Sequence, residues 1–171
     1  MRSAKFLTIP TLSALILSTK VLASTVTIPV YLVADSGQGK PIGTIAIEDH
    51  TGGGVLLTPN LHDLSPGIHG MHIHENPSCD NKAMAAGGHV DPNHSGKHEG
   101  PYDDHGHLGD LPVLVVDKDG KATLPTLAPK FTLQTLANHS IVIHAGGDNY
   151  SDTPEKLGGG GARIACGIIP S

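Results

Sequence analysis

Short runs in which apolar and polar residues alternate are the dominant pattern of this sequence. The first run has an apolar residue at every second position, namely Val26, Ile28, Val30 and Leu32. Residues 42–47 repeat the pattern after Gly37–Lys40, which is expected to form a turn. A period of two is typical of β-strands with one buried face. Glycine (22) and proline (13) are plentiful, which favours an all-β chain with many turns over one with long helices.

Eight strands are predicted from these runs and the turn residues between them, over residues 26–32, 42–47, 54–58, 68–74, 111–117, 122–127, 140–144 and 163–169. Pro29 cannot donate to a strand ladder, so the first strand is expected at a sheet edge. Asp119-Gly120 predicts a tight turn, and residues 131–138 are long enough for a helical turn only. In a chain of 171 residues this pattern indicates one domain, a β-barrel or a β-sandwich.

The first 23 residues have the composition of a secretory signal peptide. Arg2 and Lys5 precede a mostly apolar stretch over residues 6–18, and residues 21–23 end in the small residue Ala23, where a signal peptidase would cut. The alternative is a membrane anchor, but an apolar stretch of thirteen residues interrupted by Pro10 is shorter than the roughly 20 that a spanning helix needs. We therefore expect cleavage after Ala23, leaving residues 24–171 as an exported domain without a membrane anchor.

Export changes the meaning of the charges and of the two cysteines. Residues 24–171 carry 8 Lys plus Arg against 16 Asp plus Glu, a net charge of −8 with His neutral, which argues against binding to nucleic acid. In an oxidising compartment Cys79 and Cys166 are expected to form a disulfide, which by loop-closure entropy stabilises the fold by at most about 4.6 kcal/mol. Two buried free thiols are the alternative.

Histidine is unusually abundant, with twelve residues against 11 Lys plus Arg. Since imidazole is the commonest metal ligand among side chains, metal binding is the first function to consider. His72 and His74 lie on one predicted strand, where a period of two directs both rings to the same face. Two long stretches, 75–109 and 145–161, lack any period and are expected to be functional loops, the first containing five histidines. Imidazoles with a carboxylate suit zinc and copper, whereas calcium and magnesium prefer oxygen ligands.

The sequence around the histidines resembles the copper/zinc superoxide dismutase family, and its wording is closest to the bacterial periplasmic branch. The matching segments are GIHGMHIH (67–74), GGHVDP (87–92), GKHEGP (96–101), GHLGDL (106–111), HAGGDNY (144–150) and GGGGARIACGII (158–169). The resemblance covers essentially all of residues 24–171. It implies an all-β fold, an eight-stranded Greek-key β-barrel or sandwich with two long functional loops. It also implies a periplasmic enzyme that acts on superoxide with one copper and one zinc ion per subunit.

The resemblance also implies a role for each matching position. The copper ligands would be His72, His74, His89 and His144, and the zinc ligands would be His89, His98, His107 and Asp110. His69, His94 and His105 are expected not to be ligands. The remaining histidines, His50, His62 and His139, are expected to be surface or turn residues. His89 would therefore be shared by both metals.

The implied reaction alternates copper between two oxidation states, so that one superoxide leaves as oxygen and the next as hydrogen peroxide, with His89 carrying a proton. Asp148 would accept hydrogen bonds from His72 and His98 and orient them. Arg163, the one arginine after residue 23, would hold superoxide beside copper. Lys82 and Lys156 are weaker candidates for attracting the anion. The resemblance leaves open whether the protein is a monomer or a homodimer.

Two other functions are consistent with some of these residues. A non-enzymatic metal carrier on the same fold would keep the His72/His74 pair, but it would have no need of Arg163 or of a shared His89. A zinc hydrolase would use His72, His74 and a bound water with a carboxylate base. Copper content together with turnover of superoxide would separate the enzyme from both.

Overall fold

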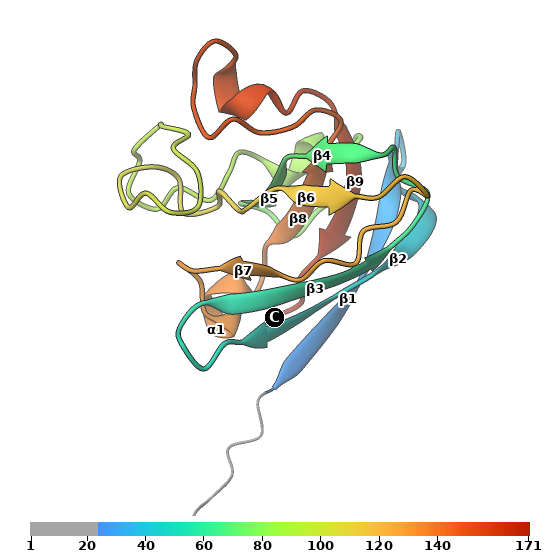
Figure 1. The fold of residues 1–171 in the computed structure, drawn as a ribbon, viewed down its shortest axis with the longest axis horizontal. Coiled ribbons are helices and arrows are strands. Elements are labelled where there is room, and N and C mark those ends of the chain that lie inside the picture. The colour runs from blue at the N-terminus through green and yellow to red at the C-terminus, as the bar shows by residue number, and fades with distance from the viewer. Residues whose placement is uncertain (1–23) are drawn as a thin grey trace, which may run out of the picture.

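The computed structural model describes residues 24–171 of the chain, so the signal peptide expected over residues 1–23 lies outside the described residues. The regular secondary structure of the described part is mostly β, as expected. Its strands are β1 (Thr25–Ala34), β2 (Gly37–Asp49), β3 (Val55–Leu61), β4 (Gly67–His69), β5 (Met71–His74), β6 (Leu114–Val116), β7 (Thr126–Ala128), β8 (Ser140–His144) and β9 (Arg163–Ile168). Seven of them form one curled antiparallel sheet in the order β5-β8-β9-β1-β2-β3-β7, and β4 pairs with β6 (Figure 1).

The first two strands form a long hairpin that differs from the prediction in two respects. Gly37–Lys40 was expected to be a turn but belongs to β2. The turn of the hairpin lies at residues 35 and 36, between the paired residues Ala34 and Gly37. The expectation that the first strand is a sheet edge is also wrong, because β1 lies between β2 and β9. Pro29 has no backbone N–H to donate. It is tolerated because the pairing of β1 with β9 involves only Tyr31 and Leu32, so no hydrogen bond from residue 29 to β9 is needed.

The predicted strand over residues 68–74 is in fact two strands that belong to different sheets, which makes nine strands in the described chain instead of eight. The division falls at Gly70, whose N–H donates to the Gly146 carbonyl and whose carbonyl accepts from the N–H of His144. The predicted strand 122–127 is also shortened: only β7 is a strand, and Ala122 makes an isolated bridge to Leu61. The strand predicted over 140–144 has the observed bounds of β8.

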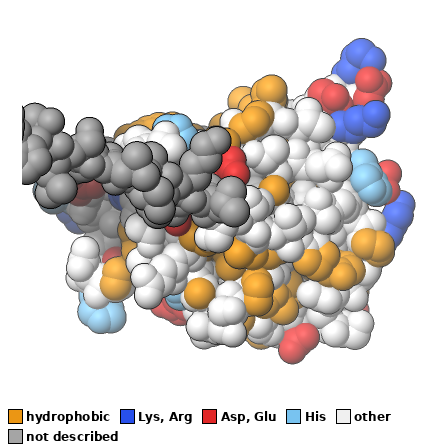
Figure 2. Space-filling model, turned by 90° about the horizontal axis from the view of Figure 1, so that it is seen from below, with side chains coloured by type: hydrophobic (Ala, Val, Ile, Leu, Met, Phe, Trp, Pro, Cys, Tyr) orange, Lys and Arg blue, Asp and Glu red, His pale blue; other side chains and the backbone are white. Residues whose placement is uncertain are grey.

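The core lies inside the curled sheet and is built from the alternating residues of the long strands. Ile28 and Val30 of β1, and Ile45 and Ile47 of β2, are at most 1% exposed. Such burial removes about 25 cal/mol of unfavourable hydration free energy per Å² of apolar surface. On the face seen in Figure 2 the charged side chains lie mostly at the rim, and hydrophobic side chains gather toward one side.

Within residues 24–171 helical structure is limited to single turns, as expected from the composition. The helical turn predicted over 131–138 is present as α1 (Leu133–Leu136), which is capped by the Thr132 side chain accepting from Thr135 N–H. Two 3₁₀ turns, η1 (Met84–Ala86) and η2 (Lys156–Gly159), lie in the two long loops. Among the described residues there is no helix of the length and apolarity that crossing a bilayer requires.

The two long loops lie at the same end of the barrel, beyond β5 and β8 (Figure 1). The loop after β5, residues 75–113, is joined to β9 by the disulfide between Cys79 and Cys166, which are 87 positions apart in the sequence. Both cysteines are buried. The predicted disulfide is therefore present, and it fixes the start of this loop to the strand that begins with Arg163.

Candidate metal centre

β5 places two imidazoles at the base of the loops. Met71 and Ile73 face the hydrophobic core, so the period of two directs His72 and His74 to the opposite face, where both are fully buried. These two rings are therefore fixed by a strand that the core holds in place.

Backbone hydrogen bonds bring two distant parts of the loop beside β5. Val90 N–H donates to the Ile73 carbonyl at 2.9 Å, and Ile73 N–H donates to the Gly109 carbonyl at 2.9 Å. Gly109 N–H in turn donates to the Val90 carbonyl at 2.8 Å. A Cβ atom at position 109 would collide with the Ile73 carbonyl oxygen, so glycine is required there. As a result His89 and Asp110, each next to one of these residues, arrive beside the β5 histidines.

Four imidazoles converge at the end of β5 and β8. The group consists of His72, His74, His89 and His144, each buried, with one ligand atom per ring all lying within 4.8 Å of one another. The rings of His72 and His89 are stacked with centroids 4.0 Å apart. One nitrogen of each ring is buried without a hydrogen-bond partner: Nδ1 of His72 and Nε2 of His74, His89 and His144. Buried polar atoms are normally satisfied, so four such nitrogens together fit a shared cation.

A second group surrounds the carboxylate of Asp110. Its Oδ1 lies 2.9 Å from Nδ1 of His89, 2.9 Å from Nδ1 of His98 and 3.4 Å from Nδ1 of His107. A tetrahedral zinc ion with bonds of about 2.0–2.1 Å separates its ligand atoms by about 3.3 Å, which is close to these distances. The other oxygen of Asp110 accepts from the N–H groups of Glu99 and Gly100, which fixes the orientation of the carboxylate.

His89 belongs to both groups. Its Nδ1 is directed to Asp110, and its Nε2 is the unpartnered atom that faces the four-imidazole group. A single ring therefore offers one nitrogen to each of two adjoining cation sites.

Asp148 connects the two groups from behind. Its two oxygens accept from Nε2 of His72 and from Nε2 of His98, both at 2.7 Å, and one also accepts from the Tyr150 N–H. Each ring thereby presents its Nδ1 to its own site. Although these three side chains are close enough to form a third cluster, their facing atoms are already paired in hydrogen bonds.

The two groups differ in the pKa values of their side chains. Burial lowers the pKa of His72 to about 3, of His74 to about 2 and of His144 to about 4. Burial also acts against a charged His98, but the neighbouring carboxylates of Asp110 and Asp148 outweigh this and raise its pKa to about 9. Burial favours a protonated Asp110, yet the three imidazoles around its carboxylate hold its pKa well below its usual range. The four-imidazole group is thus a set of neutral donors, and the second group contains a carboxylate.

Backbone carbonyls fix two further rings. His74 Nδ1 donates to the Gly87 carbonyl at 3.0 Å, and His144 Nδ1 donates to the Gly161 carbonyl at 3.2 Å. His69, expected not to be a ligand, is buried behind the site, with Nδ1 2.7 Å from the His144 carbonyl oxygen and Nε2 2.8 Å from that of Ser65. Both its nitrogens are engaged, so it has none left for a metal.

Arg163 lies next to the four-imidazole group. It is the β9 partner of His144 in the strand register, and it is half-buried. Its guanidinium donates to the carbonyls of Ala83 and Gly87, the second at 2.7 Å. The guanidinium is therefore held by the loop that the disulfide anchors.

The remaining predicted residues lie away from the two groups. Lys82 forms an ion pair with Asp35 at 2.8 Å, so its charge is already compensated. Lys156, the other weak candidate, is exposed at the start of η2. The other histidines are at the surface: His50, His62, His94 and His105 are exposed, and His139 is half-buried.

Two residues that the sequence did not single out contact this loop. Asp152 accepts from the backbone N–H of His98 at 2.9 Å. Lys130 donates to three loop carbonyls. Neither lies in a histidine-bearing segment, so no local pattern marks them.

The donor set fits a pair of transition metals. Four imidazoles suit copper, and three imidazoles with one carboxylate suit zinc in a closed tetrahedral site. The fold and the site together define a β-barrel metalloprotein with two adjoining metal sites that share a histidine.

Comparison with known proteins gives the family. A family model described as copper/zinc superoxide dismutase (SODC) matches residues 42–169. A superoxide dismutase [Cu-Zn] of Francisella tularensis subsp. holarctica is 57% identical over 141 residues, which cover 79% of this chain and 76% of the relative. The structure of the Cu/Zn superoxide dismutase from Brucella abortus superposes with a TM-score of 0.80 at 46% identity, covering 85% of this chain and 99% of the other.

The solution structure of the monomeric copper, zinc superoxide dismutase from Salmonella enterica gives a TM-score of 0.75 at 48% identity, again covering 85% of this chain and 99% of the other. The chain belongs to the copper/zinc superoxide dismutase family. It is an oxidoreductase that uses copper and zinc to convert superoxide to oxygen and hydrogen peroxide, as the sequence predicted.

Proposed function

We propose that His72, His74, His89 and His144 hold the copper ion and that His89, His98, His107 and Asp110 hold the zinc ion. The observation that carries this assignment is the unpartnered, buried nitrogen that each of the six histidines directs into one of the two groups. Copper, when bound, supplies the one-electron redox chemistry of the reaction. Zinc has no redox chemistry and supplies a fixed charge that organises the loop.

The protein's own residues bind the substrate and move a proton. Arg163 offers forked, charged donors to a small anion, and its position beside His144 places that charge at the four-imidazole group. Two superoxide ions and two protons give one oxygen and one hydrogen peroxide. We assign one of the protons to Nε2 of His89, which takes it up in the first half of the cycle and gives it to the peroxide in the second, while water supplies the other.

Asp148 has a positioning role in this proposal. Its carboxylate fixes which nitrogen of His72 and of His98 faces the metal, because a neutral ring that donates through Nε2 presents a bare Nδ1 to its site.

Alanine variants with a matched control test the ligand assignment. His107→Ala is expected to lose zinc and keep copper, and His74→Ala is expected to lose copper and most activity. His105→Ala, an exposed histidine of the same loop, serves as the control and is expected to retain both metals. Metal analysis with a superoxide dismutation assay is the measurement. If His107→Ala and His105→Ala bound zinc equally well, the assignment would be wrong.

We also propose that residues 1–23 are a signal peptide and that residues 24–171 act in the periplasm. The disulfide supports this proposal, because such bonds persist in oxidising compartments. Intact mass of protein purified from the periplasm is the test. A chain that begins at Ser24 is expected, and a mature chain that retains earlier residues would contradict the proposal.

For the oligomeric state we propose a monomer, although the sequence is also consistent with a homodimer. The Salmonella enterica relative at 48% identity is described as monomeric, and this is the support. Light scattering coupled to size-exclusion chromatography over a range of concentrations separates the two states.

A further inference from the structure

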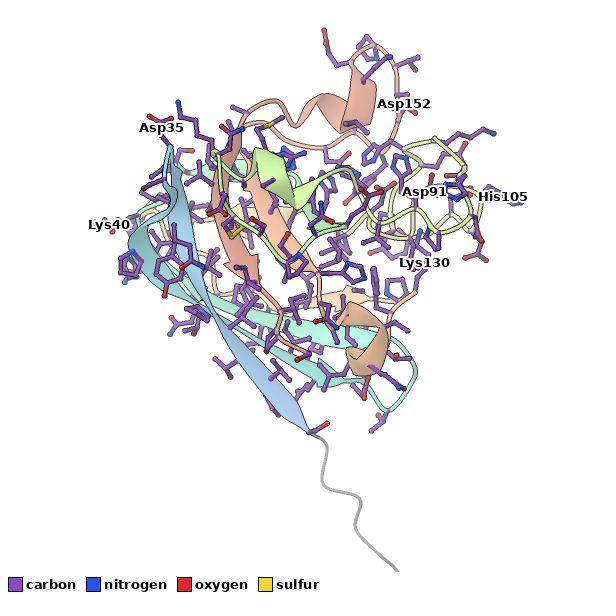
Figure 3. The ribbon with its side chains drawn as sticks, turned by 180° about the vertical axis from the view of Figure 1, so that it is seen from behind. Asp35, Lys40, Asp91, His105, Lys130 and Asp152 are labelled. Atoms are coloured by element: carbon purple, nitrogen blue, oxygen red, sulfur yellow. A yellow bond between two sulfur atoms is a disulfide. The ribbon has the colours of Figure 1, made fainter. Side chains whose placement is uncertain are left out.

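Lys130 connects the barrel to the loop that carries the proposed zinc ligands. It follows β7 in the sequence, and in Figure 3 it lies beneath the loop on which Asp91 and His105 are labelled. Its ammonium group donates to the carbonyl oxygens of Gly100, Asp103 and His107, at 3.3, 3.0 and 2.9 Å. An ammonium has three donors, so all of them are used on one loop.

The three carbonyls belong to a part of the loop that makes few hydrogen bonds of its own. Residues 101–106 form an excursion of the chain away from the zinc group. The excursion begins after Gly100 and ends before His107. Gly100 N–H donates to Asp110, and His107 N–H donates to the Lys97 carbonyl, so both ends of this excursion are tied on the metal side. Within the excursion, the further hydrogen bonds found in the described chain are local ones from His105 to Asp103.

Lys130 therefore contacts both ends and the middle of the excursion. It keeps the Gly100 and His107 carbonyls within reach of a single nitrogen atom, which holds the two ends together. Among the proposed zinc ligands His107 is the one whose own carbonyl accepts from Lys130, at 2.9 Å, so its backbone is held directly by the ammonium.

The charge of Lys130 is directed at the loop as well. No carboxylate among residues 24–171 forms an ion pair with it, so its charge is stabilised by the three carbonyl dipoles. A surface hollow of about 360 Å³, lined in part by Lys130, Asp104 and Leu108, leaves the side chain half-buried. An uncharged side chain of similar length would fit there but could not hold the carbonyls.

We propose that Lys130 is a positioning residue for the zinc site, which acts by clamping residues 100–107 so that His107 stays on the metal. The proposal rests on the zinc-ligand assignment above. It predicts that removing the ammonium weakens retention of zinc and leaves retention of copper unchanged.

The test compares Lys130→Met with Lys130→Arg, which keeps a charge and several donors. Lys121→Met is the matched control, because Lys121 is exposed and its side chain makes no hydrogen bond in the described chain. Zinc release to a chromogenic chelator is measured on the protein loaded with copper and zinc. Lys130→Met is expected to release zinc about ten- to a hundredfold faster, the range typical for loss of an outer support of a metal site. Lys130→Arg and Lys121→Met are expected to resemble the parent protein.

Replacing zinc by cobalt(II) gives a measurement that does not change when only the overall stability of the protein changes. Its visible spectrum reports the ligand geometry of the zinc site, and Lys130→Met is expected to alter it while Lys121→Met is not. Unchanged zinc release and an unchanged cobalt spectrum in Lys130→Met would overturn the proposal. Equal acceleration of copper and zinc release would also overturn it, since that result indicates a general loss of stability.

Two further variants keep these outcomes distinct. His107→Ala separates this proposal from the ligand assignment: unchanged zinc binding in His107→Ala would refute the assignment, whereas zinc loss in His107→Ala without any in Lys130→Met would refute the clamp alone. If Lys130→Met does not fold, Lys130→Leu, which also lacks donors, provides the same comparison by the same criteria.

Discussion

His74 and Arg163 donate to the same backbone oxygen, the carbonyl of Gly87, at 3.0 and 2.7 Å. A ring from β5 and a guanidinium from β9 are thus positioned by a single peptide. That peptide belongs to the loop that the Cys79–Cys166 disulfide joins to the Arg163 strand. The proposed substrate-binding residue Arg163 and the proposed copper ligand His74 are therefore positioned by the same short segment.

Replacing Arg163 by Leu should reduce kcat/KM for superoxide without removing the metals. The loss of a charge-assisted hydrogen bond costs about 1.5–3 kcal/mol, which corresponds to roughly ten- to a hundredfold. Activity of the parent protein should fall as salt rises, because residues 24–171 have a net charge of −8 and the anion depends on a local positive field. The variant should show a flatter salt dependence. A variant that holds both metals and equals the parent in rate and salt response would exclude guidance by Arg163.

Replacing Asp148 by Asn should weaken binding of both metals by about ten- to a hundredfold. The amide has one acceptor oxygen where the carboxylate has two, so it cannot accept from both His72 and His98. Competition with chelators for copper and for zinc is the measurement. Asp119→Asn, at an exposed turn, is the control and should retain both metals. Equal metal retention in the two variants would count against the orienting role.

Removing the disulfide with Cys79→Ser and Cys166→Ser together should lower the free energy of unfolding by up to about 4.6 kcal/mol, the loop-closure value for 87 residues. Urea denaturation of the metal-free protein measures this directly. Activity should also fall, because the loop that holds Arg163 loses its anchor. No change in the unfolding midpoint would mean that hydrogen bonds alone fix this loop.

Acidification should release zinc before copper. Burial is outweighed at His98 by its two carboxylate partners, so its pKa is about 9 and zinc must displace a proton from this ring at all lower pH values. Burial keeps the pKa of His72 at about 3 and that of His144 at about 4, so protons compete for these rings only in strong acid. Zinc affinity should therefore decline as pH falls below neutrality, while copper persists to a lower pH. Metal content after dialysis at a series of pH values decides this, and simultaneous loss of both metals would contradict it.

Strands could be predicted correctly where the local residue pattern determines them. The prediction failed where hydrogen bonds to backbone groups distant in the sequence determine where a strand ends. Residues 140–144 contain three consecutive β-branched residues and form β8 with the predicted bounds. Residues 68–74 were predicted to be one strand, yet they divide at Gly70 because the backbone there pairs with Gly146 and His144. Pairing with residues so far away in the sequence leaves no trace in a local period.

The site shows the same limit. The candidate ligands were found through the wording of the motifs around them, whereas their convergence depends on hydrogen bonds among residues 73, 90 and 109. Lys130 could not be found at all, since its partners are carbonyl groups, which every residue carries. Sequence reasoning identifies side chains with special chemistry and misses those that act on the backbone.

The link between His72 and His98 through Asp148 has a thermodynamic consequence. An ion bound at either site fixes a ring whose other nitrogen is hydrogen-bonded to the same carboxylate, and His89 joins the sites a second time. If binding of one ion changes the affinity of the protein for the other by some factor, binding of the second ion must change the affinity for the first by the same factor. The affinity of either site is therefore defined only for a stated occupancy of the other.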